Sequence, residues 1–446
     1  MNVWSVCFVA VILLPTIYGI TVITPVGDVI GVEKTLDIDG TPRRISVFSG
    51  IPYAESTAGA NRFRKPIPKA PFRIPFNAAE VPVGCRPMSK IYERNGLRYS
   101  EDCLVMNVHV PSQSDQTAQL PVMVWFYGGG FNQGSIAMYP ADVLSAFGDV
   151  VVVTVNYRLG PFGFLRSSDG QLIGNQGLWD QHLALRWVHD NIVAFSGNPS
   201  EVTIFGESAG AISVSLQALY PGNRGLFQRV IAESGTAVAD WSFYDRIDTH
   251  DYLVWTGCGT DITCLQSLPA ERLMTDTVSG NIADNFKPTI DNDFFVDTPY
   301  NIIFGKGSRS ESARNFFASL DFVTGVNSFE GAIFIAVIQQ LLRTRDFHNL
   351  TITPLQFSDT IIPYIVEQYM DVKDTSSLAA GTSLLNFEYT DWTQPDDVQW
   401  PRLAVVELIS DFSFFYPALQ TVAAHLSLTH RPHATYLYEF AVQPRK

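Results

Sequence analysis

Short runs of apolar, mostly β-branched residues recur along the chain and predict buried strands. Within most of these runs apolar residues follow one another without alternating with polar ones. This pattern is typical of parallel strands that are covered on both faces. The predicted strands are Leu104–Val110, Pro121–Phe126, Val150–Val155, Val202–Phe205, Val230–Ala232, Phe322–Val326 and Thr435–Phe440.

Helical patterns lie between some of these strands. From Leu178 to Phe195 the aromatic and apolar residues Trp179, Leu183 and Trp187 are spaced four apart and share one helix face. A second helical pattern, Ala209–Tyr220, follows a strand directly. Alternating strands and helices predict an α/β fold with a large, mostly parallel twisted sheet and helices on both faces. Residues 240–306 are rich in turn formers, which indicates inserted loops, and one domain is the simplest organisation.

Composition and charge narrow the class of protein. The 446 residues are 46% hydrophobic, which is ample material for a large core, and carry a formal net charge of −14. This acidic balance argues against nucleic acid as a partner. It does not indicate an oligomeric state.

The N-terminal residues have the pattern of a secretory leader. An apolar run, Val6–Leu14, precedes Pro15 and the small residue Gly19. Residues 1–19 are therefore predicted to be a signal peptide, and residues 20–446 a secreted domain. No later run approaches the ~20 apolar residues of a membrane-spanning helix, so no such helix is expected.

The cysteines agree with an extracellular chain. Of the five cysteines, Cys7 lies in the predicted leader, and an even number in a secreted protein indicates disulfides. The short intervening loops favour the pairs Cys85–Cys103 and Cys258–Cys264. Buried free thiols are the alternative. No cysteine or histidine spacing of a zinc site is present, so no metal is expected. Asn349 begins an N-glycosylation sequon, Asn-Leu-Thr.

The segment 202–210 carries the strongest chemical signal. It places Gly-Glu-Ser-Ala-Gly, a G-x-S-x-G sequence centred on Ser208, between a predicted strand and a predicted helix. Glycines allow the cramped turn that lifts the Ser208 hydroxyl above the carboxyl edge of the sheet. The N–H of Ala209 then points into the site beside a helix N-terminus, which favours negative charge. The alternative is a glycine-rich turn with a surface serine, and the flanking strand and helix argue against it.

Two further segments supply partners for such a nucleophile. Three consecutive glycines, 128–130, follow a predicted strand, and their N–H groups can join that of Ala209 to hold an oxyanion. A flexible loop is the alternative. Glu330 lies on the turn just past the strand Phe322–Val326, at the edge where Ser208 is expected. Its role would be to orient a histidine and stabilise the imidazolium.

The eight histidines do not supply an evident base. In this kind of site the chain order is Ser, then Asp or Glu, then His. Three histidines precede Ser208, namely His109, His182 and His189. Two others, His250 and His348, lie in predicted loops. The remaining three come just before the last predicted strand, at its amino end and away from the chemistry: His425, His430 and His433. A base is expected on a loop after that strand, and none of residues 441–446 is histidine.

Several motifs together resemble the type-B carboxylesterase and cholinesterase family. They are SEDCL at 100–104, NYRLGPFGFL at 156–165, GNQGLWDQ at 174–181, WVHDNI at 187–192, GESAG at 206–210 and ESG at 233–235. The resemblance runs from about Ile30 to Phe440. It implies an α/β-hydrolase that acts on a small-molecule ester, and no cofactor is expected.

The resemblance also implies roles for single residues. Ser208 matches the nucleophile and Glu330 the triad acid. Gly129, Gly130 and Ala209 match the oxyanion donors. The further matches are the disulfides Cys85–Cys103 and Cys258–Cys264, a structural ion pair of Arg158 with Asp180, and a buried acid at Glu207.

Three departures from the family pattern matter. Tyr127 stands where the family usually has His before the glycines, a mild change because the donors are the glycine N–H groups. The Cys85–Cys103 loop contains tyrosines, Tyr92 and Tyr99, but no tryptophan, which argues against acetylcholine as the substrate. The family's Gly-x-x-His segment would lie beyond Lys446, so the chain is expected to be truncated before the catalytic histidine.

The leading hypothesis is a secreted carboxylic ester hydrolase that forms an acyl-enzyme on Ser208. Phe286, Phe294 and Phe295 would shape the acyl pocket, although core packing explains them equally well. The second hypothesis is a non-catalytic, neuroligin-like binding or adhesion protein. A third is a protein that sequesters esters. The retention of Ser208, Glu330 and the glycines opposes a purely adhesive role.

Overall fold

The computed structural model describes residues 19–90, 93, 96–112, 119–244, 249–274, 286–305, 307–342, 351–368, 374–397, 399–428 and 433–442. Residues 1–18 of the predicted leader and the sequon residue Asn349 lie outside this part. Gly19, predicted as the end of the leader, begins the first strand.

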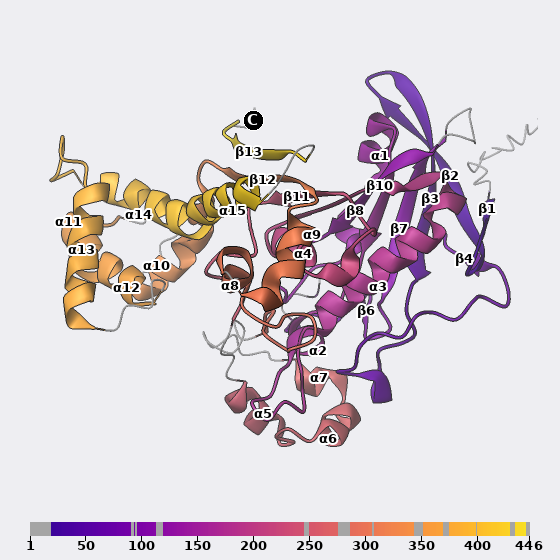
Figure 1. Ribbon diagram of the computed structural model, residues 1–446, viewed down its shortest axis with the longest axis horizontal. Coiled ribbons are helices and arrows are strands. Elements are labelled where there is room, and N and C mark those ends of the chain that lie inside the picture. The colour runs from indigo at the N-terminus through magenta and orange to yellow at the C-terminus, as the bar shows by residue number, and fades with distance from the viewer. Residues whose placement is uncertain are drawn as a thin grey trace, which may run out of the picture.

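A large mixed sheet forms the centre of the protein (Figure 1). Its strands are β1 (Gly19–Thr24), β2 (Gly27–Ile38), β3 (Thr41–Pro52), β4 (Phe76–Asn77), β7 (Val105–Pro111), β8 (Leu120–Phe126), β9 (Val151–Val155), β10 (Gly197–Glu207), β11 (Arg229–Glu233), β12 (Asp321–Asn327) and β13 (Thr435–Phe440). The 11-stranded sheet has the order β1-β2-β3-β7-β9-β8-β10-β11-β12-β13, with β4 beside β2. Pairing is antiparallel from β1 to β9 and parallel from β9 to β13.

Both faces of the sheet are covered, as β9 shows. Successive side chains of a strand point to opposite faces. Val151 and Val153 belong to the main core, to which α3 (Gln176–Asn191) and α4 (Ala209–Gln217) contribute, whereas Val152 packs with Ala141 and Phe205 on the other face. Ala141 lies just before α1 (Asp142–Gly148). The sheet with helices on both sides confirms the predicted fold class.

The predicted elements of the parallel half are all present. Each predicted strand corresponds to one of β7 to β13, and the predicted helix from Leu178 appears as α3, followed by a short 3₁₀ segment, Ile192–Phe195. Trp179, Leu183 and Trp187 are buried, so the predicted apolar face of that helix is confirmed. The antiparallel strands β1, β2 and β3 were not predicted. Within 240–306, where loops were expected, the chain also forms the short helices α5 (His250–Thr256), α6 (Ile262–Ser267), α7 (Ala270–Leu273) and α8 (Pro299–Phe304).

A helical lobe projects to one side of the sheet (Figure 1). It contains α10 (Ile335–Leu341), α12 (Ile362–Gln368), α13 (Thr375–Tyr389) and α14 (Trp400–Ser410). The lobe has a hydrophobic cluster of its own, built around Phe357, Ile361 and Val405. No helix in the described ranges is both long enough and apolar enough to span a membrane.

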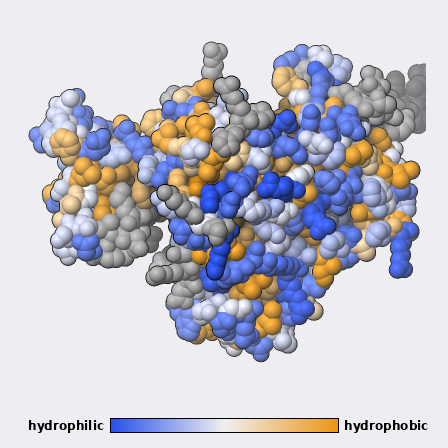
Figure 2. All heavy atoms as spheres, viewed as in Figure 1, coloured by the Kyte–Doolittle hydropathy of each residue, from blue (hydrophilic) through white to orange (hydrophobic). Residues whose placement is uncertain are grey.

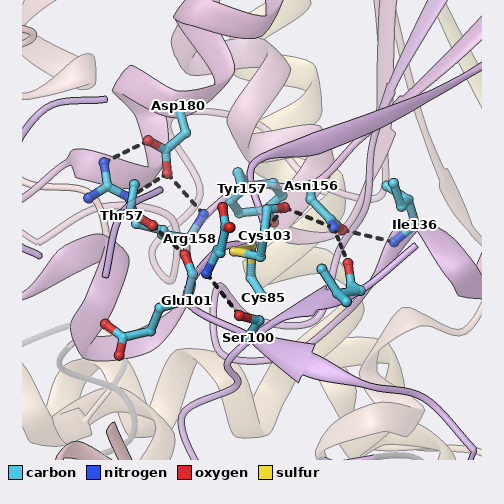
Figure 3. The surroundings of a disulfide bond; sticks show 12 residues. Thr57, Cys85, Ser100, Glu101, Cys103, Ile136, Asn156, Tyr157, Arg158 and Asp180 are labelled. Carbon is cyan, nitrogen blue, oxygen red and sulfur yellow. Dashed lines mark hydrogen bonds and ion pairs between the residues drawn. A yellow bond between two sulfur atoms is a disulfide. The ribbon is translucent and has the colours of Figure 1, made fainter. Parts of the chain in front are cut away.

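Both expected disulfides are present. Cys85–Cys103 has a Cα–Cα distance of 4.9 Å and Cys258–Cys264 one of 5.6 Å. Figure 3 shows the first disulfide beside the segment 156–158, where Arg158 pairs with Asp180. The expected structural ion pair is therefore confirmed. The side-chain amide of Asn156 donates to the Val83 carbonyl at 2.7 Å and to the Cys103 carbonyl at 3.2 Å, which connects the loop after β9 to the surroundings of β5 (Gly84–Cys85).

Candidate active site

The carboxyl ends of four parallel strands meet at one edge of the sheet. The register pairs Glu207 of β10 with Glu233 of β11, Glu233 with Gly325 of β12, and Gly325 with Tyr438 of β13. Residues just beyond this row therefore lie side by side although they are far apart in the sequence. Ser208 is one of them.

Ser208 lies on the predicted turn between β10 and α4. Its backbone has φ 58° and ψ −124°, and its N–H donates to the Glu233 carbonyl at 2.9 Å. The glycines on either side are required by close approach of the chain. A Cβ added at Gly206 would lie 2.5 Å from the Phe126 carbonyl oxygen, and one at Gly210 would lie 2.0 Å from it. The strand, strained turn and helix expected of a nucleophile elbow are thus all in place.

The glycine loop lies directly against this turn. A Cβ added at Gly128 would lie only 2.9 Å from Cβ of Ser208. Gly129 and Gly130 have φ 109° and 63°, values that glycine adopts readily. The Gly129 carbonyl accepts hydrogen bonds from Asn132 and Gln133, and within the described ranges neither glycine N–H donates to another backbone group. Ala209 is the first residue of α4, so its N–H has no acceptor within the helix.

Glu330 follows β12 at the same edge. One of its carboxylate oxygens accepts the backbone N–H of Asn327 at 2.7 Å and the side-chain amide of Asn327 at 3.1 Å. That amide also donates to the Ser234 hydroxyl at 3.3 Å, which connects the acid to the end of β11. Sequence reasoning had not singled out Asn327, because its role depends on which strand lies beside β12.

Glu207 differs from its expected environment. The residue as a whole is exposed at the sheet edge, whereas a buried acid was expected. Its carboxyl nevertheless lies close to the glycine loop, with Oε2 3.0 Å from a Cβ added at Gly128. Desolvation of the carboxyl, together with the charges of Glu330 and Glu233, raises the pKa of Glu207. The contribution of Glu330 agrees with a position of its carboxyl at the same edge of the sheet.

In the described part of the chain β13, the last strand in the order of the sheet, is largely exposed. β13 exposes several apolar side chains, including Tyr436, Leu437 and Phe440, and hydrophobic residues gather at this part of the surface in Figure 2. Tyr438 lies over Gly325, where an added Cβ would be 2.3 Å from its ring. Burial and the charges of Glu233 and Glu330 raise the pKa of Tyr438 to about 12.

The three phenylalanines considered for an acyl pocket lie in the main core. Phe286 packs edge-on against Tyr252, and Phe294 stacks on Tyr220. Phe295 contacts the ring of Phe243. These contacts favour the packing alternative.

The described histidines have partners away from Ser208. His109 pairs with Asp142 at 2.8 Å and His182 with Asn223 at 2.7 Å, while His189 contacts Asp190. His433 lies 3.7 Å from Asp321, at the start of β12. His250 begins α5, so the loop predicted for it is wrong. His348 and His430 lie outside the described residues.

His425 lies at the amino end of β13, as predicted, and is a fully buried residue of α15 (Tyr416–Leu428). Its Nε2 is 3.1 Å from the Phe317 carbonyl and its Nδ1 is 2.7 Å from the Thr435 hydroxyl, which suits a neutral imidazole. Burial lowers the pKa of His425 from 6.5 to about 4.

This shift predicts a loss of stability in mild acid. As the pH falls from 6.5 to about 4 the unfolded chain gains a proton at His425 that the folded protein does not, so the free energy of unfolding should fall by about 3 kcal/mol. Urea unfolding of the wild type and His425→Gln at pH 7 and pH 4.5 measures this. Equal losses in both proteins would contradict the prediction.

Comparison with known proteins agrees with this geometry. The sequence profile of the carboxylesterase family matches residues 19–446. The chain is 31% identical to bile salt-activated lipase of Bos taurus, covering 96% of this chain and 70% of the relative, and 31% identical to carboxylesterase 1D of Mus musculus, covering 94% and 74%. It is 34% identical to cholinesterase of Mus musculus, covering 84% of this chain and 63% of that protein.

The chain therefore belongs to the carboxylesterase family and has its α/β-hydrolase fold. Membership of this family, together with esterase and lipase relatives, makes the protein a carboxylic ester hydrolase by class.

Proposed function

We propose that this protein is a secreted serine esterase that forms an acyl-enzyme on Ser208. Ser208 Oγ attacks the ester carbonyl, and the N–H groups of Gly129, Gly130 and Ala209 hold the resulting oxyanion. Collapse of the tetrahedral intermediate releases the alcohol, and water then releases the acid. The observation that carries the proposal is the strained Ser208 turn at the start of α4, packed against Gly128.

Glu330 would orient the general base, which we propose is a histidine on a segment that follows β13. The end of β13 supports this placement, because the Phe440 carbonyl accepts hydrogen bonds from both N–H and Oγ of Ser328 at 3.3 Å. The segment that follows β13 therefore begins beside Ser328, which is two positions before Glu330 in the sequence. Within the described ranges the histidines of known contacts are engaged elsewhere, which supports a base on a segment after β13.

Secretion is the second part of the proposal. The predicted leader at residues 1–19, a single mature domain from residue 20 and the sequon at Asn349 agree with it. The disulfides Cys85–Cys103 and Cys258–Cys264 support it as well, since such bonds persist in oxidising compartments. The substrate is a small-molecule ester, and the mechanism uses neither a metal nor a cofactor.

Two measurements on the native transcript test this proposal. The transcript is sequenced through its 3′ end, and the protein it encodes is treated with a fluorophosphonate, which phosphonylates activated serines. The adduct is expected on Ser208 by peptide mass spectrometry, with Ser213, a buried serine of α4, unmodified. A chain that ends at Lys446 and gives no adduct would overturn the proposal, and a non-catalytic binding role would then lead.

A further inference from the structure

The loop that carries Gly129 and Gly130 begins at a pair of stacked tyrosines. Tyr127 directly follows β8 and Tyr157 lies two residues beyond β9, and these parallel strands end side by side with Phe126 opposite Val155. The ring centroids of the two tyrosines are 4.7 Å apart with an interplanar angle of 22°. Both residues are fully buried.

Each tyrosine hydroxyl bonds to the backbone of the other. Tyr157 Oη donates to the Tyr127 carbonyl at 2.7 Å. Tyr127 Oη donates to the Tyr157 carbonyl at 3.3 Å and lies 3.5 Å from its N–H. Burial raises the pKa of both hydroxyls far above the ordinary value, so they remain protonated donors. Buried hydroxyls that had no such partner would be costly.

The loop returns to the same ring. A Cβ added at Gly134 would lie 2.4 Å from the ring of Tyr127, and the ring of Tyr139 is parallel to it at 6.2 Å. The loop 128–134 therefore begins directly after Tyr127 and ends with Gly134 packed against the ring of the same tyrosine. Between these points lie Gly128, which touches Ser208, and the two glycines Gly129 and Gly130.

We propose that the reciprocal bonds of Tyr127 and Tyr157 form a clamp that fixes residues 128–134, the oxyanion loop, against Ser208. The peptide group is planar, so holding the Tyr127 carbonyl also sets the direction of the Gly128 N–H and of the chain that follows. Glycines have no side chains that would restrict their backbone angles, and the clamp restricts the backbone of the loop through contacts with residues outside it. Tyr127 and Tyr157 are positioning residues. Their catalytic consequence rests on the proposed function, whereas their effect on the loop does not.

Removal of one hydroxyl tests the clamp. Tyr157→Phe keeps the stacked ring and loses the 2.7 Å bond to the Tyr127 carbonyl. Tyr252→Phe is the matched control, because its buried hydroxyl also donates to a carbonyl, that of Leu273 at 2.6 Å, but in the inserted segment. Hydrogen exchange of a peptide covering residues 126–138 reports on the loop directly. Ester hydrolysis and fluorophosphonate labelling of the full protein report on the site.

In Tyr157→Phe the amides of residues 128–134 should exchange about tenfold faster, the factor expected for one lost hydrogen bond. The kcat for ester hydrolysis should fall about tenfold with KM unchanged, since a displaced donor acts in the transition state. Tyr252→Phe should show neither change. Unchanged exchange in Tyr157→Phe would overturn the clamp, and faster exchange with wild-type kcat would overturn its role in positioning. Failure of the wild type to react would instead count against the esterase, and the exchange data would still decide the clamp.

Discussion

Replacing Ser208 by alanine is expected to lower kcat for a short-chain aryl ester by about 10⁴-fold or more. Without its hydroxyl the site has no group that can form the acyl-enzyme, and only oxyanion stabilisation and binding remain. KM should change little, because substrate contacts outside the nucleophile are untouched. The measurement is steady-state hydrolysis by the protein that the complete transcript encodes.

Ser234 offers a closely matched control for this substitution. Ser208 and Ser234 have φ angles of 58° and 57°, and each follows a glutamate at the end of neighbouring paired strands. Alanine at either position must adopt the same positive φ. Ser234→Ala removes only the hydroxyl that accepts from the Asn327 amide, so it should lose far less activity than Ser208→Ala. Only Ser208 begins a helix and lies against the glycine loop. Equal losses of activity in Ser208→Ala and Ser234→Ala would show that local structure, rather than the nucleophile, had been removed.

The parts of the fold that could be predicted are those that depend on nearby residues. β9 is buried at every position, so its sequence is an apolar run without alternation, and β8 is likewise apolar throughout. β2 and β3 could not be found in this way because much of each strand is exposed and polar, as in the segment Thr41–Arg44. The helical lobe packs on a cluster of its own, and its helices carry no motif that marked them in the sequence.

The candidate site also has features that nearby residues specify and features that depend on distant parts of the chain. The turn at Ser208 is specified locally by Gly206 and Gly210, whose missing side chains make room for the Phe126 carbonyl. The environment of Glu207 is different, because it depends on Gly128, Glu233 and Glu330, which are far away in the sequence. Tyr157 was part of a recognised motif, but its bond to Tyr127 exists only because β9 lies beside β8. Strand order of this kind cannot be read from single segments.

Removal of the Asp180 carboxylate is expected to have the largest effect on stability. Asp180 and Arg158 are almost completely buried, with side-chain exposures of 0% and 3%. The carboxylate accepts the backbone N–H of Arg158 at 3.0 Å, Nε at 2.7 Å and Nη2 at 2.6 Å. In Asp180→Ala the guanidinium would remain buried without a counter-charge, and the free energy of unfolding should fall by about 3–5 kcal/mol.

Two further variants separate charge from packing in this prediction. Asp180→Asn keeps the shape of the side chain but removes the charge and replaces one oxygen that accepts from Arg158 by an NH2 donor, so it should lose most of the stability that Asp180→Ala loses. Glu80→Ala breaks an ion pair with Arg98 in which both side chains are more than two-thirds exposed, 77% and 70%, and should cost no more than about 1 kcal/mol. Urea unfolding of the three variants gives these values. If Asp180→Asn were as stable as the wild type, the buried charge would not be what holds Arg158. Arg158 directly follows Tyr157 and also donates to the Arg64 carbonyl at 2.8 Å, so its displacement should loosen the clamp beneath the oxyanion loop as well.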